Sequence, residues 1–127
     1  MRPLLLLILV AALPLTATPI AQEPQQEQTE VFTLQGIASW YGKRFHGHKM
    51  ANKKRFNQWA LTCAHRFIPL GTKLVVTSLT TGKEVIVEVT DRGPYKRGRI
   101  LDLSRAAAQR LGFIKQGKDE VVAIPAE

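Results

Sequence analysis

The sequence predicts a mainly β fold, a small barrel with one short helix. Three observations predict it: short β-branched and aromatic runs, turn residues that recur at close spacing between them, and one helical pattern near the C-terminus. The chain has 127 residues, enough for one domain with a buried core and too few for two. Its 45% hydrophobic and 22% charged residues are typical of a folded domain.

The N-terminal segment is expected to precede the folded domain. Arg2 is followed by an apolar run over residues 4–13 and then by small residues, a pattern that predicts a signal peptide over residues 1–21. The run is too short to span a bilayer, and an uncleaved anchoring segment is the alternative. The polar "EPQQEQTE" predicts a linker over residues 22–30, which leaves residues 31–127 for the domain. We therefore expect an exported protein of the periplasm or cell envelope, with no cysteine near the signal peptide to carry a lipid.

Two segments carry the strand signals of the first two thirds of the domain. "VFTLQGIASWYG", residues 31–42, is rich in β-branched and aromatic residues and predicts a strand that ends at Gly42. "GTKLVVTSLTTGKEVIVEVTD", residues 71–91, has two β-branched runs on either side of Thr81 and Gly82, which predicts a hairpin.

The second run of this hairpin places an acid at the end of an apolar pattern. Because side chains alternate along a strand, Val85, Val87, Val89 and Asp91 are expected to share one face. Asp91 is therefore predicted at the edge of an apolar face, partly removed from water.

The C-terminal part predicts one helix and a last strand. "DLSRAAAQRLGF", residues 102–113, has apolar residues four apart; Asp102 or Ser104 can cap its start, and Gly112 suits its end. "DEVVAIP", residues 119–125, then predicts the final strand.

Charge and cysteine content restrict the partners and the chemistry. The formal charge is +8, which favours an anionic partner: an acidic wall polymer, an anionic lipid or a nucleic acid. Export makes nucleic acid the least favoured, and no basic run with interleaved aromatics predicts a base-stacking surface. Cys63 is the single cysteine, so no intramolecular disulfide can form. Within the apolar "LTCAH" we interpret it as a small core residue, with a nucleophilic thiolate as the alternative.

The most informative motif is "TDRGP", in which Asp91 ends a strand and a turn follows at once. Gly93 permits an unusual backbone angle and Pro94 restricts the residue before it, so the turn fixes the direction of the carboxylate. A fixed, half-buried carboxyl group suits general acid catalysis, since burial favours its protonated form. The alternative is that Asp91 caps its own turn and Arg92 pairs with it.

Three histidines raise the question of a metal. The "HGH" segment supplies His46 and His48, and His65 follows the cysteine. Imidazole suits zinc, but this spacing matches no common ligand pattern. We therefore expect no metal and no cofactor, with histidines in solvated loops.

Three blocks of the sequence together resemble the rare lipoprotein A family of septal-ring lytic transglycosylases. They are "GIASWYGKRFHGHKMAN", "ALTCAHRFIPLGTKLVV" and "VTDRGPYKRGRILDLSRAAAQRLG", within residues 36–112. The resemblance implies a six-stranded double-psi β-barrel with one or two short helices. It also implies endolytic cleavage of peptidoglycan between N-acetylmuramic acid and N-acetylglucosamine, which leaves 1,6-anhydromuramyl ends during wall remodelling or septation.

The resemblance also implies site residues, each at a matching position. The family's turn aspartate falls on Asp91 and its histidine on His65, which are implied to be catalytic. Asn57 falls on the position three residues after the family's glutamate, and Lys54 replaces that glutamate, with a reversal of charge. Lys54 and Asn57 are therefore interpreted as substrate-binding positions.

Further substrate-binding residues are expected around these. Trp40 and Tyr41 are suited to stack on sugar rings, with core packing as the alternative. His46 is assigned to the same groove. Basic side chains of the turn are expected to bind muramyl carboxylates, with simple solvation as the alternative: Arg92, Lys96, Arg97 and Arg99.

Two functions therefore follow from the sequence. The first is a lytic transglycosylase that uses Asp91 as both acid and base, because the substrate's own 6-hydroxyl is the nucleophile. The second is a catalytically silent peptidoglycan-binding barrel, favoured by Lys54; a basic membrane-surface domain is a third alternative. We expect glycan strands as the partner, cell-division proteins as further partners, no nucleic acid, and a monomer.

Overall fold

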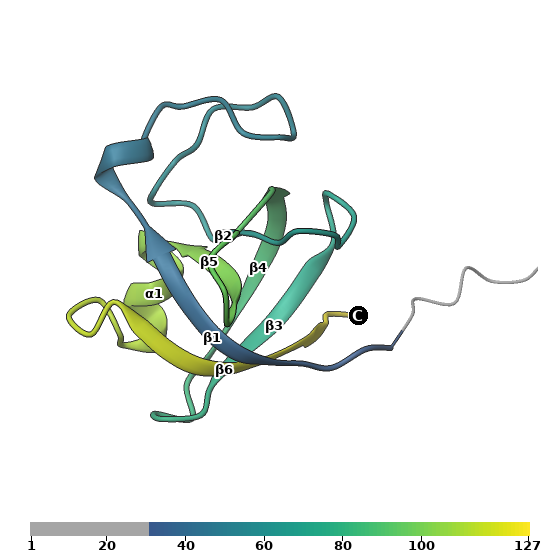
Figure 1. The fold of residues 1–127 in the computed structure, drawn as a ribbon, viewed down its shortest axis with the longest axis vertical. Coiled ribbons are helices and arrows are strands. Elements are labelled where there is room, and N and C mark those ends of the chain that lie inside the picture. Colours follow the sequence, from purple (N-terminus) through teal and green to yellow (C-terminus); the bar gives the residue numbers. More distant parts are fainter. Residues whose placement is uncertain (1–30) are drawn as a thin grey trace, which may run out of the picture.

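The computed structural model describes residues 31–127, so the predicted signal peptide and the whole predicted linker lie outside the described residues. Six strands and two short helices make up the domain (Figure 1). Their bounds are β1 (Leu34–Tyr41), the 3-10 helix η1 (Lys43–Phe45), β2 (Thr62–Ala64), β3 (Lys73–Ser78), β4 (Glu84–Asp91), β5 (Arg99–Ser104), α1 (Arg105–Leu111) and β6 (Lys118–Pro125).

The strands close into a barrel in the order β1-β5-β2-β4-β3-β6. The pairs β1/β5 and β2/β4 are parallel, and the other four pairs are antiparallel. This is the six-stranded double-psi barrel that the resemblance implies, and the mainly β prediction is confirmed. The segment between β1 and β2 projects from one side of the barrel, at the top of Figure 1.

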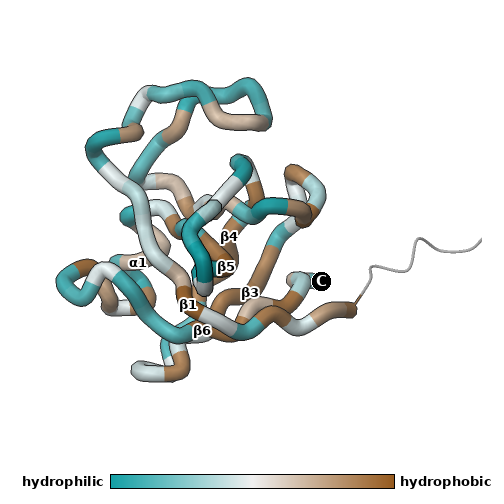
Figure 2. The backbone as a smooth tube through the Cα atoms, viewed as in Figure 1, coloured by the Kyte–Doolittle hydropathy of each residue, from teal (hydrophilic) through white to brown (hydrophobic). Residues whose placement is uncertain are grey.

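The interior of the barrel is apolar, and brown stretches mark its hydrophobic residues in β3, β4 and β5 (Figure 2). Leucine and valine side chains of β3, β4 and β5 fill it together with the buried face of α1. Cys63 lies fully buried among them, and burial raises the pKa of its thiol to about 12. A thiol in this state remains protonated at neutral pH, so it acts as the small core residue that the sequence predicts.

The predicted hairpin and helix form where the sequence places them. Gly82 has a φ of 74° in the turn between β3 and β4, a conformation that glycine adopts without strain. Ser104 caps α1 by accepting a hydrogen bond from Ala107 N, and Gly112 ends it in the left-handed conformation. Of the two predicted caps Ser104 is the one used, because Asp102 lies inside β5.

One face prediction is wrong, and its correction defines the site. Valine residues of β4 alternate inward through Val89, but the pairing with β2 then shifts: Cys63 pairs with Val89 and Ala64 pairs with Asp91. Thr90 is the extra residue of this β-bulge. Asp91 consequently shares the face of Ala64, on the outer side of the barrel wall, and does not share the inward face of Val89.

Candidate active site

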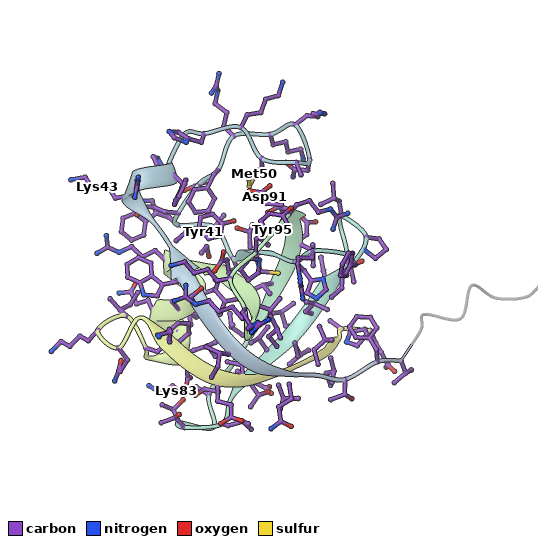
Figure 3. The ribbon with its side chains drawn as sticks, in the orientation of Figure 1. Tyr41, Lys43, Met50, Lys83, Asp91 and Tyr95 are labelled. Carbon is purple, nitrogen blue, oxygen red and sulfur yellow. The ribbon has the colours of Figure 1, made fainter. Side chains whose placement is uncertain are left out.

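An open groove of about 420 Å³ lies over the outer face of the barrel wall. One side is formed by the segment after β1, including Phe45, Met50 and Phe56, and the other by the turn after β4, residues 91–96. Figure 3 shows Asp91 beneath the projecting segment, with Met50, Tyr41 and Tyr95 around it. The groove therefore places the predicted acid where an extended ligand has access to it.

A row of paired residues crosses four neighbouring strands beneath the groove, and three of its members line the groove. Ser39 pairs with Asp102 across β1 and β5, Asp102 pairs with Ala64 across β5 and β2, and Ala64 pairs with Asp91 across β2 and β4. The side chains of Ala64, Asp91 and Asp102 all line the groove. Two carboxylates thus flank one methyl group.

The carboxylate of Asp91 is fixed from two directions. Its Oδ1 accepts hydrogen bonds from Ala51 N and from Arg92 N, both at 2.9 Å. The turn that contains Ala51 is itself held, because Asn52 N donates to Thr90 O at 3.2 Å and Met50 N donates to Lys54 O at 2.8 Å. Both bonds to the carboxylate end on Oδ1, so Oδ2 is the oxygen available to a ligand in the groove.

The alternative interpretation of the motif holds in part, because Asp91 accepts from Arg92 N within its own turn while the Arg92 guanidinium binds elsewhere. Its guanidinium Nη1 donates to His65 O at 3.2 Å and to Ile68 O at 2.6 Å. Gly93 has a φ of 123°, a conformation that side-chain-bearing residues rarely adopt. The turn therefore directs the guanidinium toward the loop after β2 and leaves the carboxylate to the groove.

His65 is not one of the residues that line the groove. Its backbone N donates to Asp91 O at 3.1 Å, and its Nδ1 accepts from Phe67 N and Ile68 N, both at 3.0 Å. Burial lowers the pKa of the imidazole, and the cations Arg66 and Arg92 lower it further. The ring is therefore held neutral with its proton on Nε2. Through these hydrogen bonds it stabilises the loop after β2, which the Arg92 guanidinium also contacts.

Tyr41 contributes the aromatic wall. Its ring stacks on Phe56 with centroids 4.4 Å apart and meets the edge of Phe45 at 5.8 Å. Burial raises the pKa of its phenol well above the usual range, and the charge of Asp91 adds to this rise. Within the described residues, neither the Tyr41 hydroxyl nor the nearby Thr62 hydroxyl has a hydrogen-bond partner. Tyr41 is thus a permanently protonated donor.

The remaining predicted residues do not line the groove. Trp40 packs against the core and its Nε1 donates to Ile114 O at 3.3 Å, so the core-packing alternative describes it. The Nδ1 of His46 accepts from Gln58 N at 3.2 Å, which ties the projecting segment to itself. The role of these two residues in substrate binding stays a prediction.

Lys54 and Asn57 also serve the projecting segment. The side chain of Asn57 accepts from Trp59 N at 3.0 Å and closes its own turn. Lys54 is exposed, and its backbone N donates to Asn52 Oδ1 at 3.0 Å. The charge reversal at Lys54 is therefore located on the solvent side of the segment that holds Asp91.

The groove is basic at its rim and acidic at its floor. Basic side chains line it from both sides: Lys49, Lys96 and Arg99. Arg97, expected with them, is exposed and lies outside the lining. The arrangement suits an anionic ligand whose reactive bond reaches the two carboxylates.

Asp102 is the groove residue that sequence reasoning missed. The sequence predicts Asp102 only as a possible helix cap. In the structure "RILDLS" forms β5, and Asp102 lies between the buried residues Leu101 and Leu103. An acid within an apolar strand is a signal of a functional position, since burying a carboxylate is costly. Within residues 31–127 no group of three or more histidine, cysteine or acidic side chains is arranged to hold a metal ion. No helix in that range is long and apolar enough to cross a membrane.

The family model and the relatives that match this sequence all describe lytic transglycosylases. The model of the lytic transglycolase family matches residues 33–123. A probable endolytic peptidoglycan transglycosylase RlpA of Aquifex aeolicus is 57% identical over 84 residues, 66% of this chain and 37% of its own length. The endolytic peptidoglycan transglycosylase RlpA of Neisseria meningitidis is 48% identical over 96 residues, 76% of this chain and 40% of its own. The chain therefore spans well under half the length of these two relatives.

Solved structures support the fold alone. An apo expansin of Clavibacter michiganensis superposes with a TM-score of 0.61 at 24% identity, covering 76% of this chain and 51% of that one. The Streptomyces papain inhibitor superposes with a TM-score of 0.59 at 19% identity, covering 76% of this chain and 96% of that one.

Proposed function

The chain belongs to the lytic transglycolase family, and we propose that it cleaves the glycan strands of peptidoglycan by lytic transglycosylation. The relatives from Aquifex and Neisseria carry that activity in their names, and the match covers the barrel and its groove. The observation that carries the proposal is the placement of Asp91, a carboxylate with one oxygen fixed by two backbone donors and the other facing an open groove.

The reaction needs a proton on the leaving sugar. In the proposed mechanism, protonated Asp91 donates to the glycosidic oxygen between N-acetylmuramic acid and N-acetylglucosamine, and the bond from that oxygen to the anomeric carbon breaks. The 6-hydroxyl of the muramyl sugar then bonds to the anomeric carbon and releases its proton to a carboxylate. The product is an anhydromuramyl end, and no water is consumed.

Other residues have supporting roles in the proposal. Tyr41 forms the aromatic wall against which a sugar ring packs. Lys49, Lys96 and Arg99 attract the lactyl carboxylates of muramyl residues. His65 and Arg92 act as positioning residues, because both hold the loop whose backbone contacts the Asp91 carbonyl.

We place this activity outside the cytoplasm, in the periplasm or cell envelope. The apolar run over residues 4–13 after Arg2 supports export, and the glycan substrate is found there. A monomer that works beside cell-division proteins is the form we propose.

A binding module without catalysis is the second candidate, and one observation favours it. Lys54 stands where the family pattern has a glutamate. In such a module the same groove would hold the glycan, and Asp91 would only accept hydrogen bonds from sugar hydroxyls.

The test is incubation of the purified protein with glycan strands that lack stem peptides, followed by mass spectrometry of the soluble products. The proposal expects anhydromuramyl ends. Reducing muramyl ends would mean that water attacks and that the enzyme is a hydrolase. Absence of products, together with retention of the protein on insoluble glycan, would support the binding module.

A further inference from the structure

The row across the groove floor contains two acids with similar access to a ligand. β2 lies between β4 and β5, and its residue Ala64 pairs with Asp91 on one side and with Asp102 on the other. Neighbouring strands lie about 4.8 Å apart, so the Cα atoms of the two acids are separated by roughly 10 Å. Directly opposed residues share a face, so both carboxylates rise from the same side of the wall. The Ala64 methyl is the smallest apolar side chain and leaves the space between them open.

Asp102 is held as firmly as Asp91, by a different donor. The hydroxyl of Ser39, its partner on β1, donates to Oδ1 of Asp102. The second oxygen, Oδ2, faces the turn that follows Asp91: a Cβ added to Gly93 would lie 4.0 Å from it. The turn residue that borders Oδ2 therefore has no side chain. The pattern repeats that of Asp91, with one oxygen used for positioning and the other free for a ligand.

The two acids also act on a common neighbour. The charges of Asp91 and of Asp102 both raise the pKa of the Tyr41 phenol, so its buried hydroxyl lies within electrostatic reach of both carboxylates. Tyr41, Asp91 and Asp102 all line the same groove. The two carboxylates therefore lie close enough together to act on one neighbour.

We propose that Asp102 is the second carboxylate of the reaction, the base that takes the proton of the attacking sugar hydroxyl while Asp91 protonates the leaving oxygen. The inference rests on the proposed function. The anomeric carbon exchanges its bond to the glycosidic oxygen for a bond to the 6-hydroxyl oxygen; one proton leaves Asp91 and one arrives at Asp102. Solvent in the open groove then returns the proton from Asp102 to Asp91.

Two features of this chain favour divided roles over a single acid and base. Asp91 has only Oδ2 available, and that oxygen would have to give up one proton and accept another at a second position on the substrate. The glutamate of the family pattern is absent, and its replacement Lys54 lies on the solvent side of the segment. Asp102 is thus the carboxyl group in the groove that can complete a pair.

The test compares Asp102→Asn with wild type and with Asp91→Asn in the anhydromuramyl assay. Asparagine retains an oxygen that accepts from Ser39, so the barrel contact is conserved while the base is lost. General base catalysis contributes about 100-fold to 10,000-fold. We expect kcat to fall at least about 100-fold, with KM changed by less than about threefold. Formate added to Asp102→Ala is expected to restore part of the rate, which a merely structural residue would not allow.

Each outcome separates this inference from the proposed function. If wild type is active, Asp91→Asn is inactive and Asp102→Asn retains the wild-type rate, only the role of Asp102 is overturned. If wild type forms no anhydromuramyl ends, both fail. If the circular dichroism spectrum shows that Asp102→Asn is unfolded, Ser39→Ala is tested in its place. That variant keeps the Asp102 carboxylate but removes the hydrogen bond that orients it. An unchanged kcat in folded Ser39→Ala would overturn the inference, and a roughly tenfold fall would support it.

Discussion

The backbone N–H of Ala51 donates to Oδ1 of Asp91 at 2.9 Å, which joins the segment after β1 to the acid at the end of β4. The two residues are forty positions apart in the chain. A conformational change in the projecting segment would therefore release the carboxylate from one of its two donors. This contact makes the geometry of the turn that contains Ala51 a determinant of the site, although none of its exposed side chains enters the groove.

The same turn contains a strained residue whose replacement should stabilise the protein. Lys53 has a φ of 73°, the only positive φ of a non-glycine residue within residues 31–127. The left-handed conformation costs a side-chain-bearing residue about 1–2 kcal/mol, and glycine loses about 0.5–1 kcal/mol more backbone entropy on folding. Lys53→Gly should therefore raise the free energy of unfolding in urea by about 0.5 kcal/mol. Lys54→Gly, at a neighbour with ordinary φ, should lower it, and a fall in Lys53→Gly would contradict the account.

Ser104 links β5, α1 and the loop before β2, so its removal should be costly. Its buried Oγ accepts from Ala107 N at 3.3 Å and donates to Ala60 O at 2.6 Å. Ser104→Ala removes the helix cap and leaves the carbonyl of Ala60 without this donor. The expected loss is about 2 kcal/mol of the free energy of unfolding. Gln109→Ala, on the exposed face of the same helix, should change it by less than about 0.5 kcal/mol.

His65 should make stability depend on pH in a defined direction. Its pKa is lower in the folded protein than the ordinary value near 6.5, so below that value the unfolded chain binds a proton that the folded protein does not. Stability from this residue is therefore complete above pH 6.5 and declines as the pH falls toward the folded pKa. His65→Asn keeps an acceptor for Phe67 N and Ile68 N but does not titrate. Urea unfolding at pH 5 and pH 7 should show a smaller pH difference for this variant than for wild type.

Lys54→Glu restores the family's charge at a position that faces solvent. The side chain is exposed and lies outside the groove. Interactions between exposed charges are weak because water and dissolved ions screen them. We expect the rate of anhydromuramyl formation to change by less than about threefold, as for Lys43→Glu on η1. A gain of tenfold or more in Lys54→Glu alone would show that a carboxylate at this turn takes part in the reaction.

The sequence predicted the elements whose signals are local. The alternation of Val85, Val87 and Val89 sufficed for β4, and Ser104 with Gly112 marked the helix. β5 was missed because its last residues overlap the helix signals and because a short strand gains its stability from partners on both sides. β2, three residues long, is likewise determined by pairing and not by propensity.

The site was predictable in its chemistry and less so in its geometry. The turn glycine and proline identified Asp91, but its outward direction results from the bulge at Thr90, which exists only because β4 pairs with β2. The role of Asp102 depends on its register with Ala64, a contact between segments 38 residues apart by number (102 minus 64). Trp40 and His46 have side chains suited to sugar binding, but in the fold they form hydrogen bonds with Ile114 O and Gln58 N. Such non-local contacts are not encoded in any short motif.

The central claim is that Asp91 performs the chemistry, and one variant tests it most directly. Asp91→Asn keeps an oxygen that accepts from Ala51 N and Arg92 N, so the groove is conserved and only the transferable proton is lost. Glu84→Gln, on the exposed start of β4, is the matched control for loss of one carboxylate. With glycan strands that lack stem peptides, we predict that anhydromuramyl products fall at least about 100-fold in Asp91→Asn and persist in Glu84→Gln. Undiminished product from a folded Asp91→Asn would contradict the account.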